Sequence, residues 1–317
     1  MPGRPIGPVA ALPPCSPALL ECVDVITTNV SDTALIFEGG GMRAAFSSGV
    51  AAALLEADIH LDWVGGISAG SSCTVNYVSR DPGRAERSFV DVAAHPQFGD
   101  WRTWVAGKGM FNAEWIYEHT SLPHQALPLD LDTFRANPAQ VRIGAVRCAD
   151  GQMVYWGRED LGDVVSLAKR VRASSTMPLL MPITTIDGVD YCDGALGPTG
   201  GFAVDQAAAD GYDRFLVVMT RQRGYRKPPV RSTAAMRMLF RRYPAVARAL
   251  IERPANYNRS VSELLRLERE GRAYLVFPDS MPIRNSERRV PVLRSVFHAG
   301  HAQTQRELDA IRAFVGL

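Results

Sequence analysis

Hydrophobic and polar positions alternate in blocks that predict strands followed by helices. Residues 33–37 (TALIF) form a short apolar run, as a buried strand does. Residues 42–56 then place apolar side chains four residues apart, along one face of a helix. Residues 61–67 and 69–78 repeat the pattern of strand and helix. Two such units in succession predict a parallel sheet covered by helices.

The pattern continues toward the C-terminus with one irregular region. Residues 81–140 hold three of the five tryptophans and lack a clear period, so we expect an insertion or cap of helices and loops there. The other expected strands are residues 141–146, 153–156, 189–192, 215–220 and 274–277, and the other expected helices are 163–172, 203–209 and 303–314. The expected fold class is α/β, with a central, mostly parallel sheet flanked by helices and a mainly helical C-terminal region.

The chain divides into three predicted parts. Residues 1–32 begin with six prolines among the first 17 positions, a density that breaks helices, so we expect a flexible lead-in and no signal peptide. Residues 33–220 form the expected main domain, and 221–317 a basic C-terminal region that completes the fold. No run of about 18 uncharged apolar residues predicts a membrane span. We therefore expect a cytoplasmic protein that is peripheral to a membrane at most.

Composition excludes several classes of protein. The 317 residues are 46% hydrophobic, which is enough for a large core and excludes disorder as the main state. A net charge of +2 gives no whole-protein reason to expect nucleic-acid binding. The five cysteines are scattered without CxxC spacing, which argues against a disulfide framework and a cysteine zinc site: Cys15, Cys22, Cys73, Cys148 and Cys192.

One segment departs from this balance. Residues 221–259 hold eleven Lys and Arg and a single acid, for a net charge of +10. Apolar side chains such as Leu239 and Phe240 lie among the arginines, and Pro244 is expected to kink a helix or start a second one. Two interpretations remain open: an element that contacts anionic lipid at a membrane surface, or a solvated helical face beside the core.

The clearest chemical motif is Gly66-Ile67-Ser68-Ala69-Gly70, a G-x-S-x-G sequence between an expected strand and an expected helix. That context is what a nucleophile elbow requires, because a serine on a tight strand-to-helix turn has its hydroxyl exposed at the sheet edge. Gly66 and Gly70 leave room for the close approach of the following helix. The helix N-terminus favours the negative charge of a tetrahedral intermediate.

A second motif, Gly39-Gly40-Gly41-Met42-Arg43, also lies between a strand and a helix. Consecutive glycines can direct backbone N–H groups to one point. A nucleotide site is the weaker interpretation, because Ala44 replaces the last glycine of G-x-G-x-x-G and the P-loop lysine is absent. The alternative is an oxyanion hole for Ser68, to which Gly39, Gly40, Gly41 and Arg43 would contribute.

A third motif, Asp193-Gly194-Ala195, follows a short expected strand and on its own is typical of a turn. The small-residue stretch Ala173-Ser174-Ser175 precedes Pro178. In this order, the motifs resemble those of the patatin-like phospholipase family: its glycine-rich oxyanion motif, its nucleophile elbow, the segment before its catalytic aspartate, and its D-G-[AG]. The resemblance covers residues 33–220. Ala44 departs from a glycine that is common in the family's first motif.

The resemblance implies a Ser–Asp dyad, with Ser68 as nucleophile and Asp193 as the base that takes its proton. A serine hydroxyl needs such a base, and partial burial makes a carboxylate a better one. The implied reaction is hydrolysis of a lipid acyl ester, from phospholipid or lysophospholipid, through an acyl-Ser68 intermediate. That chemistry needs no metal or other cofactor, and no nucleic-acid partner is expected.

Three alternatives remain open at this stage. A Ser–Asp–His triad would make the protein a general carboxylesterase or acyltransferase, and only His298 and His301 follow Asp193 as the order of that triad requires. Both are expected at the start of the closing helix, where a surface role is favoured, and no third ligand completes a metal site with them. A non-catalytic lipid-binding protein is the remaining alternative, against which intact Ser68 and Asp193 argue.

Overall fold

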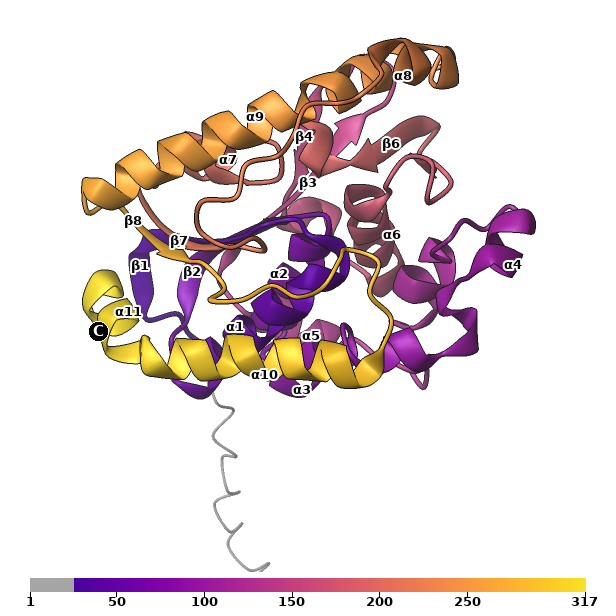
Figure 1. Cartoon of the computed structure of the whole chain (residues 1–317). Helices are drawn as coiled ribbons and strands as arrows, with labels where there is room; N and C mark the ends of the chain where they lie inside the picture. Colours follow the sequence, from indigo (N-terminus) through magenta and orange to yellow (C-terminus); the bar gives the residue numbers. More distant parts are fainter. Residues whose placement is uncertain (1–25) are drawn as a thin grey trace, which may run out of the picture.

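The chain folds around one mixed sheet of eight strands (Figure 1). The computed structural model describes residues 26–317. The parallel strands are, in spatial order, β3 (Gln140–Arg147), β2 (Leu61–Ile67), β1 (Val30–Phe37), β7 (Arg214–Val218) and β8 (Ala273–Val276). The antiparallel strands are β4 (Met153–Trp156), β5 (Thr184–Ile186) and β6 (Val189–Asp193). The expected α/β fold with a mostly parallel sheet is confirmed.

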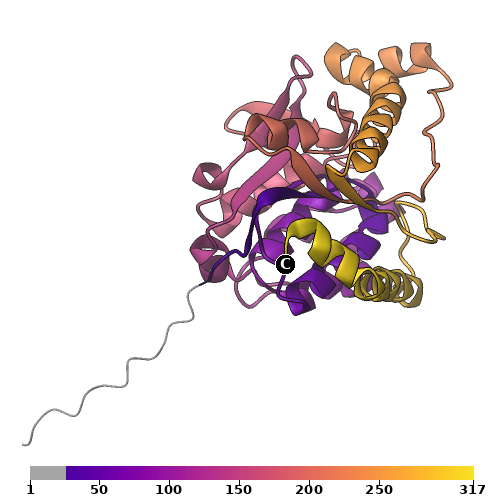
Figure 2. The same cartoon turned by 90° about the vertical axis from the view of Figure 1, so that its left-hand side faces the viewer.

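Helices cover both faces of this sheet (Figure 2). On one face lie α7 (Val204–Ala209) and α9 (Pro244–Arg269). On the other face lie α1 (Ala44–Glu56), α2 (Ala69–Val78), α6 (Val164–Ser175) and α10 (Val290–Arg306). The remaining helices are α3 (Pro82–Arg87), α4 (Trp101–Val105), α5 (Leu131–Ala136), α8 (Thr233–Leu239) and α11 (Leu308–Val315). Of these, α3, α4 and α5 lie in the irregular region 81–140. The helices α8 and α11 belong, together with α9 and α10, to the helical C-terminal region.

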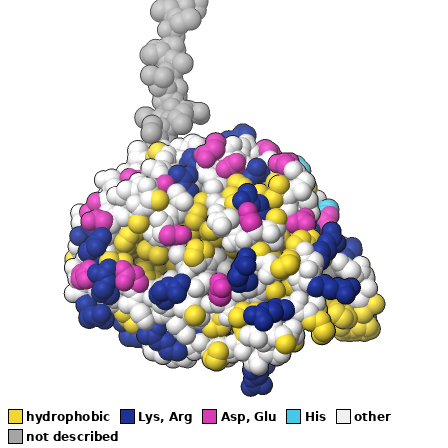
Figure 3. Space-filling model, turned by 90° about the horizontal axis from the view of Figure 1, so that it is seen from above, with side chains coloured by type: hydrophobic (Ala, Val, Ile, Leu, Met, Phe, Trp, Pro, Cys, Tyr) yellow, Lys and Arg dark blue, Asp and Glu magenta, His cyan; other side chains and the backbone are white. Residues whose placement is uncertain are grey.

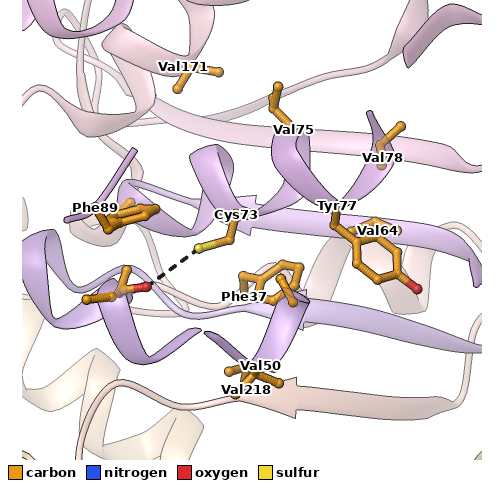
Figure 4. Close-up of a cluster of buried hydrophobic side chains, with 14 of the residues drawn as sticks. Phe37, Val50, Val64, Cys73, Val75, Tyr77, Val78, Phe89, Val171 and Val218 are labelled. Atoms are coloured by element: carbon orange, nitrogen blue, oxygen red, sulfur yellow. Dashed lines mark hydrogen bonds between the residues drawn. The ribbon is translucent and has the colours of Figure 1, made fainter. Parts of the chain in front are cut away.

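The larger core lies between the sheet and the face that α1 and α2 cover. Figure 4 shows Phe37 of β1 and Tyr77 of α2 packed beside Val64 and Val218. Cys73 lies in the same cluster, with its Sγ 3.9 Å from the carbonyl oxygen of Ala44. Burial raises the pKa of this thiol well above its ordinary value, so Cys73 packs as a small apolar side chain.

Two other cysteines of the described residues are buried as well. Cys148 and Cys192 are buried and free, on the ends of neighbouring strands. The hydrogen bond with the neighbouring Cys148 thiol, followed by burial, raises the pKa of Cys192. Cys15 and Cys22 lie outside the described residues, as do residues 1–25 of the predicted lead-in.

The first strand begins earlier than predicted, at Val30 rather than residue 33. Val30 is buried, and its N–H donates to the carbonyl of His60 at 3.2 Å. The side chain of Asn29 also donates to the carbonyl of Asp58. A valine between polar residues gives too short an apolar signal to reveal this pairing. The division of the chain into parts at residues 33 and 221 stays a prediction.

The predicted closing helix 303–314 is wrong in its bounds. The structure has two helices instead, α10 from Val290 to Arg306 and α11 from Leu308 to Val315. Pro291 occupies the first turn of α10, where its missing N–H costs no hydrogen bond. His298 and His301 therefore lie in the second half of a long helix and not at its start.

Several elements have no predicted bounds, and β5 and α9 show why. The strand β5 has only three residues, too few for a periodic signal. The helix α9 runs for 26 residues and contains Pro254, a residue that normally ends a helix. Pro244 starts this second helix after α8, which is one of the two outcomes expected for it.

Candidate active site

Ser68 lies on the turn between β2 and α2, at the carboxyl end of the parallel strands. Its φ of 58° is uncommon for a residue with a side chain and marks a strained turn. Gly66 and Gly70 meet inside the turn, because a Cβ on Gly66 would lie 2.2 Å from the carbonyl oxygen of Gly70. Both predicted glycines therefore have a steric role in the geometry of an elbow.

The register of the sheet brings Asp193 beside Ser68. Ile67 pairs with Gly144 of β3, and Asp193 of β6 pairs with Ala145, the next residue. The Ser68 hydroxyl donates to Oδ2 of Asp193 at 2.9 Å, and both side chains are buried. The two residues singled out from the sequence, 125 positions apart, are thus in direct contact.

Asp193 is held by its own motif. Its Oδ1 accepts the N–H of Ala195 at 2.8 Å, and Gly194 packs so closely on Gly144 that a Cβ there would lie 2.3 Å from the carbonyl oxygen. Burial raises the pKa of Asp193 above its ordinary value, and the charge of Arg253 and the Ala195 N–H oppose that rise. A carboxylate with a raised pKa is a stronger base than an exposed one.

The backbone of Ser68 is fixed by Ser174, at the end of α6. The N–H of Ser68 donates to Oγ of Ser174 at 2.9 Å, and that hydroxyl donates in turn to the carbonyl of Gly144 at 2.6 Å. Ser174 is fully buried. One hydroxyl therefore ties the elbow to β3 and to the small-residue segment that the sequence singled out.

The glycine-rich segment passes directly beside Ser68. A Cβ on Gly39 would lie 3.0 Å from the Cβ of Ser68. The N–H of Gly39 donates to the carbonyl of Gly201 at 3.2 Å, so that donor is already in use. Among the hydrogen bonds of residues 26–317, none involves the backbone N–H of Gly40 or Gly41. The N–H of Ala69, in the first turn of α2, also has no acceptor within its own helix.

An apolar cavity of about 50 Å³ opens onto Ser68. Its walls also include Gly41, Met42 and Ala69. The apolar side chains that line it come mainly from the irregular region 81–140 and the segment after α6: Phe89, Phe98, Phe111, Ile116, Met177 and Met181. A second cavity shares Ser72 and Tyr117 with the first and continues inward to the buried Arg84. An apolar wall therefore lies next to the Ser68 hydroxyl.

Charged side chains gather beside the glycine-rich segment. Glu38 is buried at the end of β1, and burial raises its pKa. Arg43 is also buried, with its Nε donating to the carbonyl of Thr220 at 3.2 Å. Burial and the charge of Arg221 lower the pKa of Arg43 to about 10. The charge of Glu38 opposes this lowering of the Arg43 pKa, so the two buried groups interact.

The basic segment 221–259 adds two cations to this cluster. The Nζ of Lys227 lies 4.5 Å from the ring centroid of Tyr257, and its backbone is bonded to the side chain of Asn258. Burial and the charge of Arg253 lower the pKa of Lys227 to about 7. Lys227 and Arg253 both lower the pKa of Asp193, so they face the site from the side of α9.

Neither histidine after Asp193 reaches this site. Nε2 of His301 is 2.7 Å from Oε2 of Glu56, at the last residue of α1. The helix α1 begins beside the glycine-rich segment, so Glu56 lies about 18 Å farther along its axis. His298 is exposed on α10. The hydroxyl of Ser68 is bonded to Asp193 alone among the described side chains.

The sequence left several residues of this site unassigned. Glu38, Lys227 and Arg253 have no motif around them, and the aromatic lining belongs to a region without a period. Two signals could have found them. Lys227 is one of only three lysines, in a segment of high net charge, and Glu38 directly precedes the glycine triplet at the end of a strand.

Comparison with known proteins gives two family matches. The family described as patatin-like phospholipase matches residues 35–203, and a domain of unknown function, DUF6363, matches residues 243–316. The first match contains the elbow, the glycine-rich segment and the D-G-A motif. The second contains α9, α10 and α11.

Two individual proteins are also similar. The chain is 28% identical over 189 residues to the uncharacterized protein YjjU of Escherichia coli, covering 59% of this chain and 51% of that protein. The chain thus spans about half the length of this curated relative. The crystal structure of VipD from Legionella pneumophila superposes with a TM-score of 0.49 at 13% identity, covering 88% of this chain and 67% of that one. In residues 26–317, no helix is both long enough and apolar enough to cross a membrane.

Proposed function

The chain belongs to the patatin-like phospholipase family, and from that premise we propose that it hydrolyses the acyl ester of a phospholipid or lysophospholipid through an acyl-Ser68 intermediate. One observation supports this more than any other. The Ser68 hydroxyl donates to a buried carboxylate at 2.9 Å, at the mouth of an apolar cavity. A nucleophile, its base and an apolar binding site are thereby adjacent.

The proposed reaction has two steps. Oγ of Ser68 attacks the ester carbonyl carbon while Asp193 takes its proton, and the tetrahedral intermediate collapses as Asp193 returns that proton to the leaving alcohol. Asp193 then takes a proton from a water that attacks the acyl-Ser68 ester. The second intermediate collapses as Asp193 returns that proton to Oγ of Ser68, which releases the fatty acid and restores the Ser68 hydroxyl.

We assign the oxyanion donors within this mechanism to the N–H groups of Gly40, Gly41 and Ala69. Gly41 and Ala69 line the same cavity as Ser68, and Gly40 directly precedes Gly41. Among the backbone hydrogen bonds of residues 26–317 outside helices and strands, none uses these three N–H groups. Gly39 instead shapes the segment, since its N–H is bonded to Gly201. Arg43 supports the segment through the carbonyl of Thr220. Removing one such donor typically slows acyl transfer by about 100- to 1,000-fold.

The cations beside the site favour a phosphate-bearing lipid over a neutral ester. The positive charges of Arg43 and Arg253, with the partial charge of Lys227 whose pKa is about 7, exceed the negative charges of Glu38 and Asp193, whose pKa values burial raises. An anionic group on the alcohol side of the ester would balance that excess charge. The apolar cavity would hold the acyl chain, so the two halves of a phospholipid would meet different surroundings.

The substrate class can be tested with pairs of lipids that share acyl chains. Release of fatty acid from phosphatidylglycerol should exceed release from the matching diacylglycerol, and Lys227→Met should reduce that preference several-fold. Arg259→Met is the matched control, because Arg259 is an exposed cation on α9 that is bonded to Asn256. A preference for diacylglycerol, or hydrolysis only of soluble short-chain esters, would contradict the proposed substrate.

We place the protein in the cytoplasm and propose that it meets anionic membranes transiently, partly through the segment 221–259. The exposed apolar side chains of Met238 and Leu239 lie next to Arg237 and Arg241 there. The proposed mechanism does not use a Ser–Asp–His triad, because the side chain of His301 is hydrogen-bonded to Glu56. A non-catalytic lipid binder would leave the strained Ser68 and the buried Asp193 without a role.

A further inference from the structure

The loop that contains α4 projects from the body of the protein. Figure 1 shows α4 at the far right, beyond α6 and the sheet. The loop is closed at its base, where the N–H of Asn112 donates to the carbonyl of Phe98 at 3.0 Å. The N–H of Met110 also donates to the carbonyl of Leu180 at 2.8 Å. Residues 99–110 therefore form a defined projection with a fixed base, which we call the α4 loop.

The tip of the α4 loop exposes large apolar side chains. Trp101 is 64% exposed, Trp104 56% and Val105 71%. Met110, in the same loop, and Leu179, beside its contact with Leu180, are exposed as well. Figure 3 shows hydrophobic side chains gathered at the right-hand edge, the edge from which α4 projects in Figure 1. Exposed apolar groups of this size mark a surface that binds something.

The charges of the loop are positive. The guanidinium of Arg102 lies 5.4 Å from the ring centroid of Trp101, and Lys108 is exposed. The sequence from residue 101 to residue 113 has no acid. Asp100 is used locally, since its Oδ1 accepts two N–H groups at the start of α4. Tryptophan combined with basic side chains suits the boundary between anionic headgroups and acyl chains.

The base of the same loop lines the cavity at Ser68. Phe98 and Phe111 flank the α4 loop in sequence, and both lie in the wall of that cavity. Their rings pack edge to face, 5.6 Å apart. Met181, next to the Leu180 that holds the loop, is part of the wall too. The loop with the exposed apolar tip therefore has its base in the wall of the cavity.

We propose that the α4 loop is a membrane anchor, which inserts Trp101, Trp104 and Val105 into the headgroup region of an anionic lipid surface beside the entrance to the catalytic cavity. The occupant is a lipid surface because the loop combines tryptophan with basic side chains and its base lines the cavity that would hold an acyl chain, and in that respect the inference rests on the proposed function. An acyl chain in the cavity would contact Phe98 and Phe111 at the base of the loop.

Binding to vesicles tests this inference without relying on hydrolysis. The full chain is prepared with Ser68→Ala, so that the vesicles stay intact, and co-sedimented with vesicles of phosphatidylcholine and phosphatidylglycerol. Adding Trp101→Ala and Trp104→Ala should raise the Kd for vesicles about tenfold or more, because binding strength follows the apolar area buried. Replacing both tryptophans by phenylalanine should restore most of the binding. Val165→Ala removes an apolar side chain that is 54% exposed on α6 and should change nothing.

Two further measurements separate the anchor from other roles. With Ser68 intact, the double alanine variant should hydrolyse a soluble short-chain ester at the parental kcat/KM, while its action on vesicles falls with binding. The double variant Met238→Ala with Leu239→Ala measures how much α8 contributes to vesicle binding. Loss of vesicle binding in that variant alone would overturn the inference. Equal binding by parent and tryptophan variant, or binding by neither, would also overturn it. Intact vesicle binding by a protein that hydrolyses no lipid would contradict the proposed function alone.

Discussion

At the scale of single residues, the site combines strain with an unfavourably buried charge. Ser68 has a positive φ, and Asp193 is a buried carboxyl with a raised pKa. Both features cost stability and make sense where a nucleophile needs an exposed hydroxyl and a base stronger than an ordinary aspartate. The hydroxyl of Ser174 holds this arrangement in place from α6.

Asp193→Asn should stabilise the protein at neutral pH. The folded-state pKa of Asp193 lies above its unfolded value, so its contribution to stability is complete below about pH 4 and is lost as pH rises through the folded pKa. Asparagine does not ionise, so the variant does not lose this stability as the pH rises. The Tm of the variant should exceed that of the parent at pH 7, and the difference should shrink toward pH 4.

The control for this comparison is Asp187→Asn, since Asp187 is exposed in a turn. Its Tm should follow the parent at every pH. A lower Tm for Asp193→Asn at pH 7 would show that the ionised carboxylate is stabilising and that its pKa is not raised.

Arg253→Met should shift the acid limb of the pH–rate profile upward. The positive charge of Arg253 lowers the pKa of Asp193, and Asp193 must be ionised to act as the base. Removing the charge raises the pKa, so kcat/KM on a soluble ester should begin to fall at a higher pH than in the parent. An unchanged acid limb of the pH–rate profile would contradict an effect of Arg253 on Asp193. An equal shift in the variant of the exposed Arg259, Arg259→Met, would contradict it too.

Ser174→Ala should reduce both stability and turnover. It leaves the buried N–H of Ser68 and the carbonyl of Gly144 without their partner, which costs about 1–3 kcal/mol of the free energy of unfolding. Urea unfolding measures that loss, and kcat should fall while KM changes little, because the elbow is less well positioned. Ser174→Thr keeps a hydroxyl and should recover part of the kcat. Parental kcat in Ser174→Ala would contradict a role of Ser174 in positioning Ser68.

At the scale of elements, the basic segment 221–259 places its cations in two different parts of the molecule. Arg221, Lys227 and Arg253 turn toward the site, whereas Arg237, Arg241 and Arg248 line an outer groove at α8 and the start of α9. Figure 3 shows Lys and Arg spread among apolar side chains over this upper face. Composition reveals the excess charge of such a segment, but only the path of the backbone decides which cations point inward.

The sequence predicted the elements around the site better than those that cover it. The strand 61–67 and the helix 69–78 match β2 and α2 at both ends, because a buried strand and a glycine-bounded turn leave clear signals. The bounds of α9 and α10 were missed because Pro254 and the scattered arginines obscure the period. The contact between Ser68 and Asp193 depends on strand register, which the sequence alone does not contain, so their pairing came from the family resemblance.

The crossing of α1 and α10 provides a test at this scale. A Cβ on Gly300 would lie 2.2 Å from the carbonyl oxygen of Phe46, so the two helices touch through backbone. Gly300→Ala should lower the free energy of unfolding by about 1–3 kcal/mol, although alanine favours helices. Urea unfolding measures the change. Gly162→Ala is the control, because nothing lies near that position, and equal stability of both variants would contradict the close crossing.

At the scale of the whole molecule, the sheet separates two kinds of surroundings that meet at its carboxyl edge. The apolar cavity lies on the side of α2 and α6, and the cations of Lys227 and Arg253 approach from the side of α9. Ser68 lies between them. A lipid ester with an apolar chain on one side of the carbonyl and a charged group on the other would match this division.

The central claim is that Ser68 and Asp193 form a catalytic dyad without histidine. The most direct measurement is the hydrolysis of a soluble p-nitrophenyl ester and a fluorescent phospholipid by the parent, Ser68→Ala, Asp193→Asn and the double variant His298→Ala with His301→Ala. We predict that the first two variants lose turnover while remaining folded, and that the histidine double variant keeps the parental rate. Loss of turnover in the folded double histidine variant, or undiminished turnover without Asp193, would contradict the dyad.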